Sequence, residues 1–189
     1  EGIFIQLNTN QIKSWINSES KALEARLKSM VKRRDELERN MPYPSPEFVL
    51  LHTFSHLLMN QLCFESGYGM SSVREKLYVD MEKGMMGVLI YTADADSEGA
   101  LGGLVRMGNE DRLLHSIKAM LESARWCSAD PACIELGSPG TLGLNKAACH
   151  SCALISETSC PHFNSMLDRA MLIGSNDENL TGFFETLRN

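Results

Sequence analysis

The sequence predicts a mixed α/β (α+β) fold that is helix-rich, with a small central sheet and a cysteine-ligated zinc site. Apolar residues recur at helical spacing over two long stretches, 10–39 and the segment that follows Ser45. The short apolar run Gly87–Tyr91 predicts a buried strand. Five of the six cysteines gather between Cys127 and Cys160, in a segment with little that could pack. We therefore expect helices around a small sheet, with a metal ion holding the cysteine-rich segment in shape.

Residues 1–46 are predicted to form an N-terminal edge strand and a long amphipathic helix. The apolar stretch Gly2–Ile5 is typical of a strand, and because the chain opens at Glu1 without methionine we expect a piece of a longer polypeptide. The helix over 10–39 carries a basic group in its middle, interleaved with acidic residues, which favours a solvated face over a phosphate-contacting patch. The members of this group are Arg26, Lys28, Lys32, Arg33 and Arg34.

Residues 47–189 are predicted to form a zinc-binding domain with its cysteine cluster at 127–160. Ser45 suits the N-cap of a helix and Pro46 its first position, and the residues that follow are apolar enough to be buried. The segment 72–81 is compatible with either a helix or a strand. Three further helices are predicted: one capped by Asn109, a short one from Asn145 through Cys152, and an amphipathic one over 164–173.

The spacing of the cysteines defines the candidate metal ligands. Cys149 and Cys152 have only two residues between them, which lets the chain bend and present two thiolates to one tetrahedral ion. Such an ion takes four ligands, so one cysteine is spare, or His150 replaces one of them, and the count leaves this open. A disulfide framework or unconnected buried cysteines is the alternative interpretation. The candidate ligands are Cys127, Cys133, Cys149, Cys152 and Cys160.

A second set of residues supports an enzymatic alternative, a metal-dependent nuclease. His52 and His56 are four residues apart and share one face of the predicted helix, as paired metal ligands would. The motif H-E-x-x-H is absent, however, and histidines on an apolar helix are more often hydrogen-bonded core residues. Asp94, Asp96 and Glu98 follow the predicted strand, where acidic metal sites of nucleases often lie, although an acidic loop that caps backbone amides is the simpler interpretation. A P-loop and a G-x-S-x-G elbow are both missing, so we expect no ATPase or protease activity.

Charge and hydropathy restrict the partners of the chain. Its formal net charge of −6 argues against a surface that attracts nucleic acid by electrostatics alone. No apolar stretch approaches the roughly 18 residues that span a membrane. We expect a cytoplasmic protein without a membrane partner, whose contact with DNA is local or depends on another protein.

Several motifs taken together resemble the zinc-binding domain of the MrfA/MrfB type, and within it the C-terminal part of DrmB-type proteins of the DISARM anti-phage defence system. They are L-H-T-F-S-H-L-L (51–58), G-V-L-I-Y-T-A-D-A-D-S-E-G-A-L-G-G-L (87–104), D-P-A-C (130–133), L-N-K-A-A-C-H-S-C (144–152), E-T-S-C (157–160) and N-S-M-L-D-R-A (164–170).

The resemblance implies Zn²⁺ bound by the five clustered cysteines as a set, and a superfamily 2 DNA helicase of the DrmA type as partner. It also implies a zinc-stabilised accessory domain of a helicase-associated defence protein, which docks on the helicase and assists DNA engagement without being an enzyme itself. A metal-stabilised interaction module that involves no nucleic acid is a further alternative.

Overall fold

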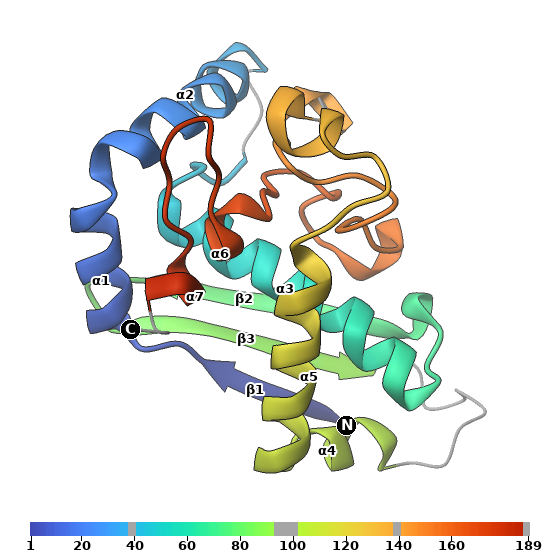
Figure 1. Cartoon of the computed structure of the whole chain (residues 1–189). Coiled ribbons are helices and arrows are strands. Elements are labelled where there is room, and N and C mark those ends of the chain that lie inside the picture. Colours follow the sequence, from blue (N-terminus) through green and yellow to red (C-terminus); the bar gives the residue numbers. More distant parts are fainter. Residues whose placement is uncertain (38–40, 93–101, 138–140, 187–189) are drawn as a thin grey trace.

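Helices cover one face of a small antiparallel sheet in the computed structural model of the chain, which describes residues 1–37, 41–92, 102–137 and 141–186 (Figure 1). The predicted helix-rich α+β class is confirmed. The strands are β1 (Gly2–Gln6), β2 (Val73–Asp80) and β3 (Met85–Thr92), and the α-helices are α1 (Thr9–Ser18), α2 (Ser20–Glu36), α3 (Pro46–Ser66), α4 (Gly103–Met107), α5 (Glu110–Ala124), α6 (Ala170–Ile173) and α7 (Phe183–Thr186). Shorter helical turns are η1 (Met70–Ser72), η2 (Ala132–Gly137), η3 (Thr141–Gly143) and η4 (Glu157–Ser159).

The sheet has the strand order β1-β3-β2, and both neighbouring pairs are antiparallel. The predicted edge strand and buried strand are therefore present as β1 and β3. The segment 72–81, which the sequence left open, contains strand β2. Ile3 and Ile5 of β1 are buried while Phe4 between them is exposed, because successive side chains of a strand point to opposite faces.

Helix α3 forms the centre of the molecule, as its apolar sequence predicts. The Ser45 hydroxyl accepts a hydrogen bond from the backbone N–H of Phe48 at 3.4 Å, and Pro46 occupies the first turn. The helix ends at Gly67, whose φ of 77° is readily adopted only by glycine. Its side chains are buried from Phe48 to Met59, and it packs on β2, β3, α5 and α6.

The predicted helix over 10–39 consists of two helices, α1 and α2, that meet at Glu19. Glu19 has non-helical dihedral angles (φ −101°, ψ 12°), and its carboxylate accepts the backbone N–H of Thr181 at 3.0 Å. The Trp15 indole N–H donates to the carbonyl of Thr181 at 2.8 Å. These contacts with the C-terminal segment hold the junction of the two helices against the core. The division into units 1–46 and 47–189 stays a prediction.

Two predicted helices in the C-terminal third are wrong. Asn145 does not cap a helix through Cys152; its side-chain N–H₂ donates to the carbonyl of Asn164, and its side-chain oxygen accepts the N–H of Leu167. In the segment 164–173 only α6 is helical, because Asn164 and Met166 have positive φ values of 53° and 60°, which a right-handed helix excludes. The chain that carries the cysteines is thus built mainly of turns and loops.

Candidate metal centre

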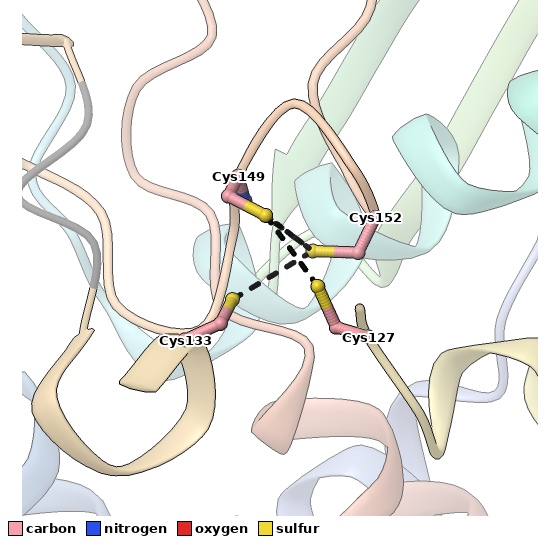
Figure 2. A group of neighbouring side chains, drawn as sticks. All are labelled: Cys127, Cys133, Cys149 and Cys152. Carbon is pink, nitrogen blue, oxygen red and sulfur yellow. Dashed lines mark hydrogen bonds between the residues drawn. The ribbon is translucent and has the colours of Figure 1, made fainter. Parts of the chain in front are cut away.

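Four cysteine sulfurs converge on one point in the cysteine-rich segment (Figure 2). The Sγ of Cys149 lies 3.5 Å from that of Cys127 and 3.7 Å from that of Cys152, and the sulfurs of Cys133 and Cys152 are 3.9 Å apart. A tetrahedral zinc ion with Zn–S bonds of 2.3 Å places its sulfur ligands about 3.8 Å from one another. The sulfur positions therefore fit a closed Cys₄ zinc site.

Each cysteine lies on a turn or just after the end of a helix. Helix α5 ends three residues before Cys127, Cys133 lies on the π-helical turn η2, and a tight turn links Cys149 to Cys152. Backbone N–H groups point at two of the sulfurs, from Ala129 to Cys127 at 3.4 Å and from Cys149 to Cys152 at 3.3 Å. Such donors stabilise the negatively charged thiolate, which is the form that binds metal.

Arg169 connects three parts of the cysteine-bearing chain from a fully buried position. Its guanidinium donates to the carbonyl of Ala124 at 2.8 Å and forms an ion pair with Asp130. Its backbone N–H donates to the carbonyl of Ala147 at 3.1 Å. Asp130 in turn accepts the backbone N–H of Cys127 at 2.8 Å. The end of α5, the turn after Cys127 and the approach to Cys149 are therefore all tied to one residue, the first two through its side chain and the third through its backbone.

The electrostatics of this group call for a cation. Burial and, after it, the negative charges of Cys149 and Cys127 together raise the pKa of the Cys133 thiol to about 12. Burial opposes the charge on Arg169, but Asp130 and the sulfurs of Cys152 and Cys133 hold the pKa of Arg169 above its ordinary value. A Cys₄ site with Zn²⁺ carries two net negative charges, and Arg169 is the buried cation placed to compensate them.

The fifth candidate ligand, Cys160, lies in a different group. Its Sγ is 3.3 Å from Nε2 of His52, and the carboxylate of Glu75 lies 3.1 Å from that same nitrogen and 3.2 Å from Nε2 of His56. The structure thus brings four of the five predicted cysteines together and places Cys160 with the two histidines. His150, the other predicted substitute, is exposed and belongs to neither of the groups found among the described residues.

Glu75 is the member of this second group that sequence reasoning missed. Burial opposes its ionisation, but His52 and His56 hold the pKa of Glu75 well below its ordinary value. Burial also lowers the pKa of His52 to about 4, although Glu75 acts in the opposite direction. The sequence held one signal for Glu75. It lies two residues after the buried Val73, so on a strand its acidic side chain points to the same inward face.

The structure describes only part of the remaining sequence-predicted residues. Asp94, Asp96 and Glu98 lie outside the described residues. His52 and His56 are both 0 % exposed, so a phosphodiester in solvent has no contact with them in this conformation. Of the basic group on α2, Arg26 is buried and forms ion pairs with Asp168 and Glu178, contrary to a solvated face.

Comparison with known proteins identifies the domain. The family model of the MrfA Zn-binding domain matches residues 54–153, which is more than half of the chain. The chain belongs to the MrfA Zn-binding domain family. Zinc, the cofactor expected from the sequence, is the metal that defines this family, and the Cys₄ group is suited to it.

The chain is also similar over almost its whole length to a curated defence protein. It is 39% identical over 196 residues to the DISARM protein DrmB of Bacillus paralicheniformis (strain ATCC 9945a / NCIMB 11709 / CD-2), an alignment that covers 99% of this chain and 34% of that protein. The chain thus spans about a third of the length of the relative it matches. The resemblance to DrmB-type proteins is confirmed. Among the described residues, no helix has the length and apolar character needed to cross a membrane.

Proposed function

We propose that the chain is a zinc-stabilised accessory domain of a DISARM anti-phage defence protein, which docks on a superfamily 2 DNA helicase of the DrmA type and assists DNA engagement. Its similarity to DrmB supports the defence role. The observation that carries the docking role is an exposed tryptophan next to the metal centre. Trp126 directly precedes Cys127 and is 72% exposed.

Trp126 lines a shallow pocket of about 180 Å³ between α3 and α5. Leu57 of α3, Met120 of α5 and the ligand Cys152 line the same pocket. Tryptophan is among the residues that contribute most to protein–protein affinity, above all when it stands beside a pocket that the partner can fill. The zinc ion and the Arg169–Asp130 pair hold this part of the chain in place before binding, which lowers the entropic cost of docking.

The basic residues of α2 support an auxiliary rather than an independent contact with DNA. Arg33 donates to the carbonyl of Leu142 at 2.9 Å, and Arg34 donates to the carbonyl of Met41 at 3.1 Å. Lys28 and Lys32 remain exposed on the same helix. Two lysines on a chain with a net charge of −6 give weak and salt-dependent binding unless a partner already holds the duplex. No catalytic step on DNA or ATP is part of this proposal.

Docking is tested with the purified helicase and two variants that each remove one exposed aromatic side chain. Trp126→Ala should weaken helicase binding by about 30-fold, the effect of a contact worth about 2 kcal/mol. Phe4→Ala is the matched control, because Phe4 is 56% exposed on the sheet face turned away from the core. Isothermal titration calorimetry would measure the affinity of the helicase for the wild type, Trp126→Ala and Phe4→Ala, with equal zinc contents in all three proteins. Equal affinities of wild type and Trp126→Ala would overturn the docking surface.

The DNA role is tested by comparing duplex binding of the helicase alone, with the wild-type chain and with variants of α2. Replacing Lys28 and Lys32 together by Ala removes charge without touching the contacts of Arg33 and Arg34. The chain should raise duplex affinity of the helicase, and the double variant should raise it less and with a shallower salt dependence. If the chain leaves the helicase's duplex affinity unchanged, the DNA part of the proposal fails while the docking part stands.

A further inference from the structure

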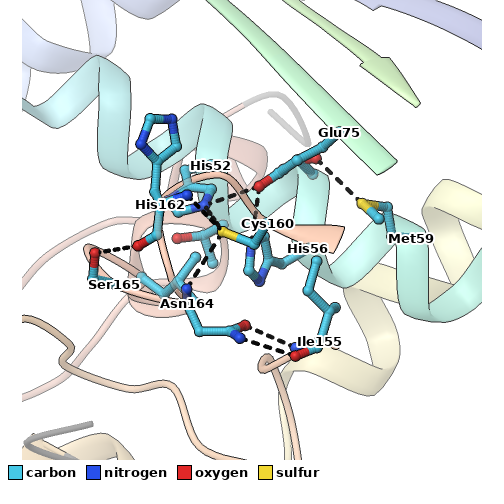
Figure 3. A network of polar contacts seen from close by, with 12 residues as sticks. His52, His56, Met59, Glu75, Ile155, Cys160, His162, Asn164 and Ser165 are labelled. Carbon is cyan, nitrogen blue, oxygen red and sulfur yellow. Dashed lines mark hydrogen bonds and ion pairs between the residues drawn. The ribbon is translucent and has the colours of Figure 1, made fainter. Parts of the chain in front are cut away.

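A second group of metal-binding side chains lies inside the core, away from solvent (Figure 3). His52 and His56 come from α3, Glu75 comes from β2, and Cys160 follows the turn η4. One ligand atom from each lies within 4.8 Å of every other, and the four residues are between 0 and 3 % exposed. Three segments far apart in sequence thus deliver nitrogen, oxygen and sulfur ligands to one buried point.

Hydrogen bonds alone do not give every buried polar atom of this group a partner. Nδ1 of His56 lies 3.0 Å from the carbonyl oxygen of Ala153, which can only accept, so Nδ1 carries the proton. In the neutral form, in which histidine binds metal, Nε2 then presents a lone pair to the carboxylate of Glu75 at 3.2 Å. The second oxygen of Glu75, Oε2, has no hydrogen-bond partner among the described residues. Acceptors facing acceptors in a buried site are costly, and a cation between them removes the cost.

The sulfur of Cys160 accepts hydrogen bonds from backbone N–H groups, as a sulfur of the Cys₄ group does. It accepts backbone N–H groups from His162 and Asn164, each at 3.4 Å. Cys127 likewise accepts the N–H of the residue two positions further on, Ala129, at 3.4 Å. These donors favour a thiolate. A thiolate beside the Glu75 carboxylate is tolerable only if positive charge lies between them.

We infer that His52, His56, Glu75 and Cys160 form a second, closed zinc site that ties α3 to β2 and to the chain after η4. The Nε2–Oε1 distances of 3.1 and 3.2 Å and the Nε2–Sγ distance of 3.3 Å lie near the roughly 3.3–3.6 Å expected between ligands of a tetrahedral zinc ion. Four protein ligands leave no open position, which is typical of structural rather than catalytic zinc.

The charge balance explains why this site is fully buried and the Cys₄ site only partly buried. One thiolate and one carboxylate neutralise Zn²⁺, and two neutral imidazoles add nothing, so the complete site has no net charge. A neutral site loses little when water is excluded. The Cys₄ site with zinc keeps two negative charges, and accordingly Cys149 and Cys152 are partly exposed and Arg169 lies nearby.

The first test needs no variant, because the two ligand sets differ in their atoms. Elemental analysis of the purified chain should give two zinc ions. Zinc X-ray absorption should then fit five sulfur and three nitrogen or oxygen ligands for every two ions, the sum of the two groups. One zinc per chain with sulfur ligands only would overturn the second site and leave the Cys₄ site and the docking proposal intact.

Variants assign the two ions to their groups. Cys160→Ser and Glu75→Gln should each lower the zinc content from two to one and leave a sulfur-only absorption spectrum. Cys149→Ser should also lower it to one, but with the mixed ligand set retained. Cys63→Ser is the matched control, a buried thiol on α3 outside both groups, and it should keep both ions. A zinc content in Cys160→Ser and Glu75→Gln equal to that of the control contradicts the inference.

Discussion

Replacing Arg169 by Met should weaken zinc binding at the Cys₄ site, although Arg169 is not itself a ligand. The change removes the hydrogen bond to Ala124 and the ion pair with Asp130, and with them a positive charge close to the sulfurs of Cys133 and Cys152. Loss of a residue that supports metal ligands typically lowers affinity 10- to 100-fold. That range corresponds to about 1.4–2.8 kcal/mol of binding free energy.

Cobalt reports mainly on this site, because its thiolate charge-transfer band grows with the number of sulfur ligands, and this group offers four sulfurs where the group around Glu75 offers one. Titration with Co²⁺, followed by displacement with Zn²⁺ at known chelator concentration, gives the dissociation constant of the Cys₄ site. Arg169→Lys keeps the charge but not the planar fork that reaches Ala124 and Asp130 together, so its affinity should lie between those of wild type and Arg169→Met.

Arg26→Met is the control, since Arg26 is an equally buried arginine whose carboxylate partners are Asp168 and Glu178. It should change the dissociation constant of the Cys₄ site less than threefold. If Arg169→Met and Arg26→Met lowered zinc affinity equally, the effect would be general destabilisation, and the role assigned to Arg169 would be refuted.

Three further outcomes are expected. Arg26→Met should lower the free energy of unfolding in urea by about 3–5 kcal/mol, because it leaves the fully buried Asp168 carboxylate without its cation; a loss below about 1 kcal/mol would contradict this. Burial opposes the ionisation of Glu178, but Arg26 holds the pKa of Glu178 below the ordinary 4.5. The stability that this ion pair contributes is therefore present above about pH 4.5 and is lost as the pH falls through the lowered pKa. Glu178→Gln should therefore flatten the stability profile between about pH 5 and 3, and an unchanged acid limb would exclude this pair as its cause. Cys149→Ser should make residues 127–153 more sensitive to proteolysis than the rest of the chain, since this segment depends on the Cys₄ ion, and uniform sensitivity in mass-spectrometric mapping would argue against that dependence.

Local signals in the sequence were enough to predict the elements that position the site. Ser45 and Pro46 are adjacent residues that mark the start of α3, and both act as predicted. The two predicted helices that are absent from the structure are replaced by contacts between residues far apart in sequence, which no local pattern reveals. Asn145 bonds to Asn164 and Leu167 across the fold, and these long-range bonds accompany positive φ values that end helical periodicity after Cys160.

The same distinction applies to the metal ligands. The C-x2-C spacing of Cys149 and Cys152 makes the Cys₄ group visible in the sequence, because a single turn brings both sulfurs together. The fifth cysteine shares that neighbourhood in sequence but not in space. Its partners come from α3 and β2. Strand β2 contains no Cys or His that would mark Glu75 as part of a metal site. Only the packing of α3 on the sheet reveals that Cys160 and Glu75 face the same histidines.

The distance along the chain between ligands sets an order in which the two groups can assemble. Within the Cys₄ group, Cys127 and Cys149 are 22 residues apart, whereas His52 and Cys160 are separated by 108. Closing the longer loop costs about 1.4 kcal/mol more in chain entropy, and contacts between distant residues also form more slowly. The Cys₄ turn can therefore close around its ion while the rest of the chain is still unfolded. The group around Glu75 needs α3 and β2 packed together, so these separations predict that the short cysteine-rich segment folds early and that the core between helix and sheet becomes fixed last.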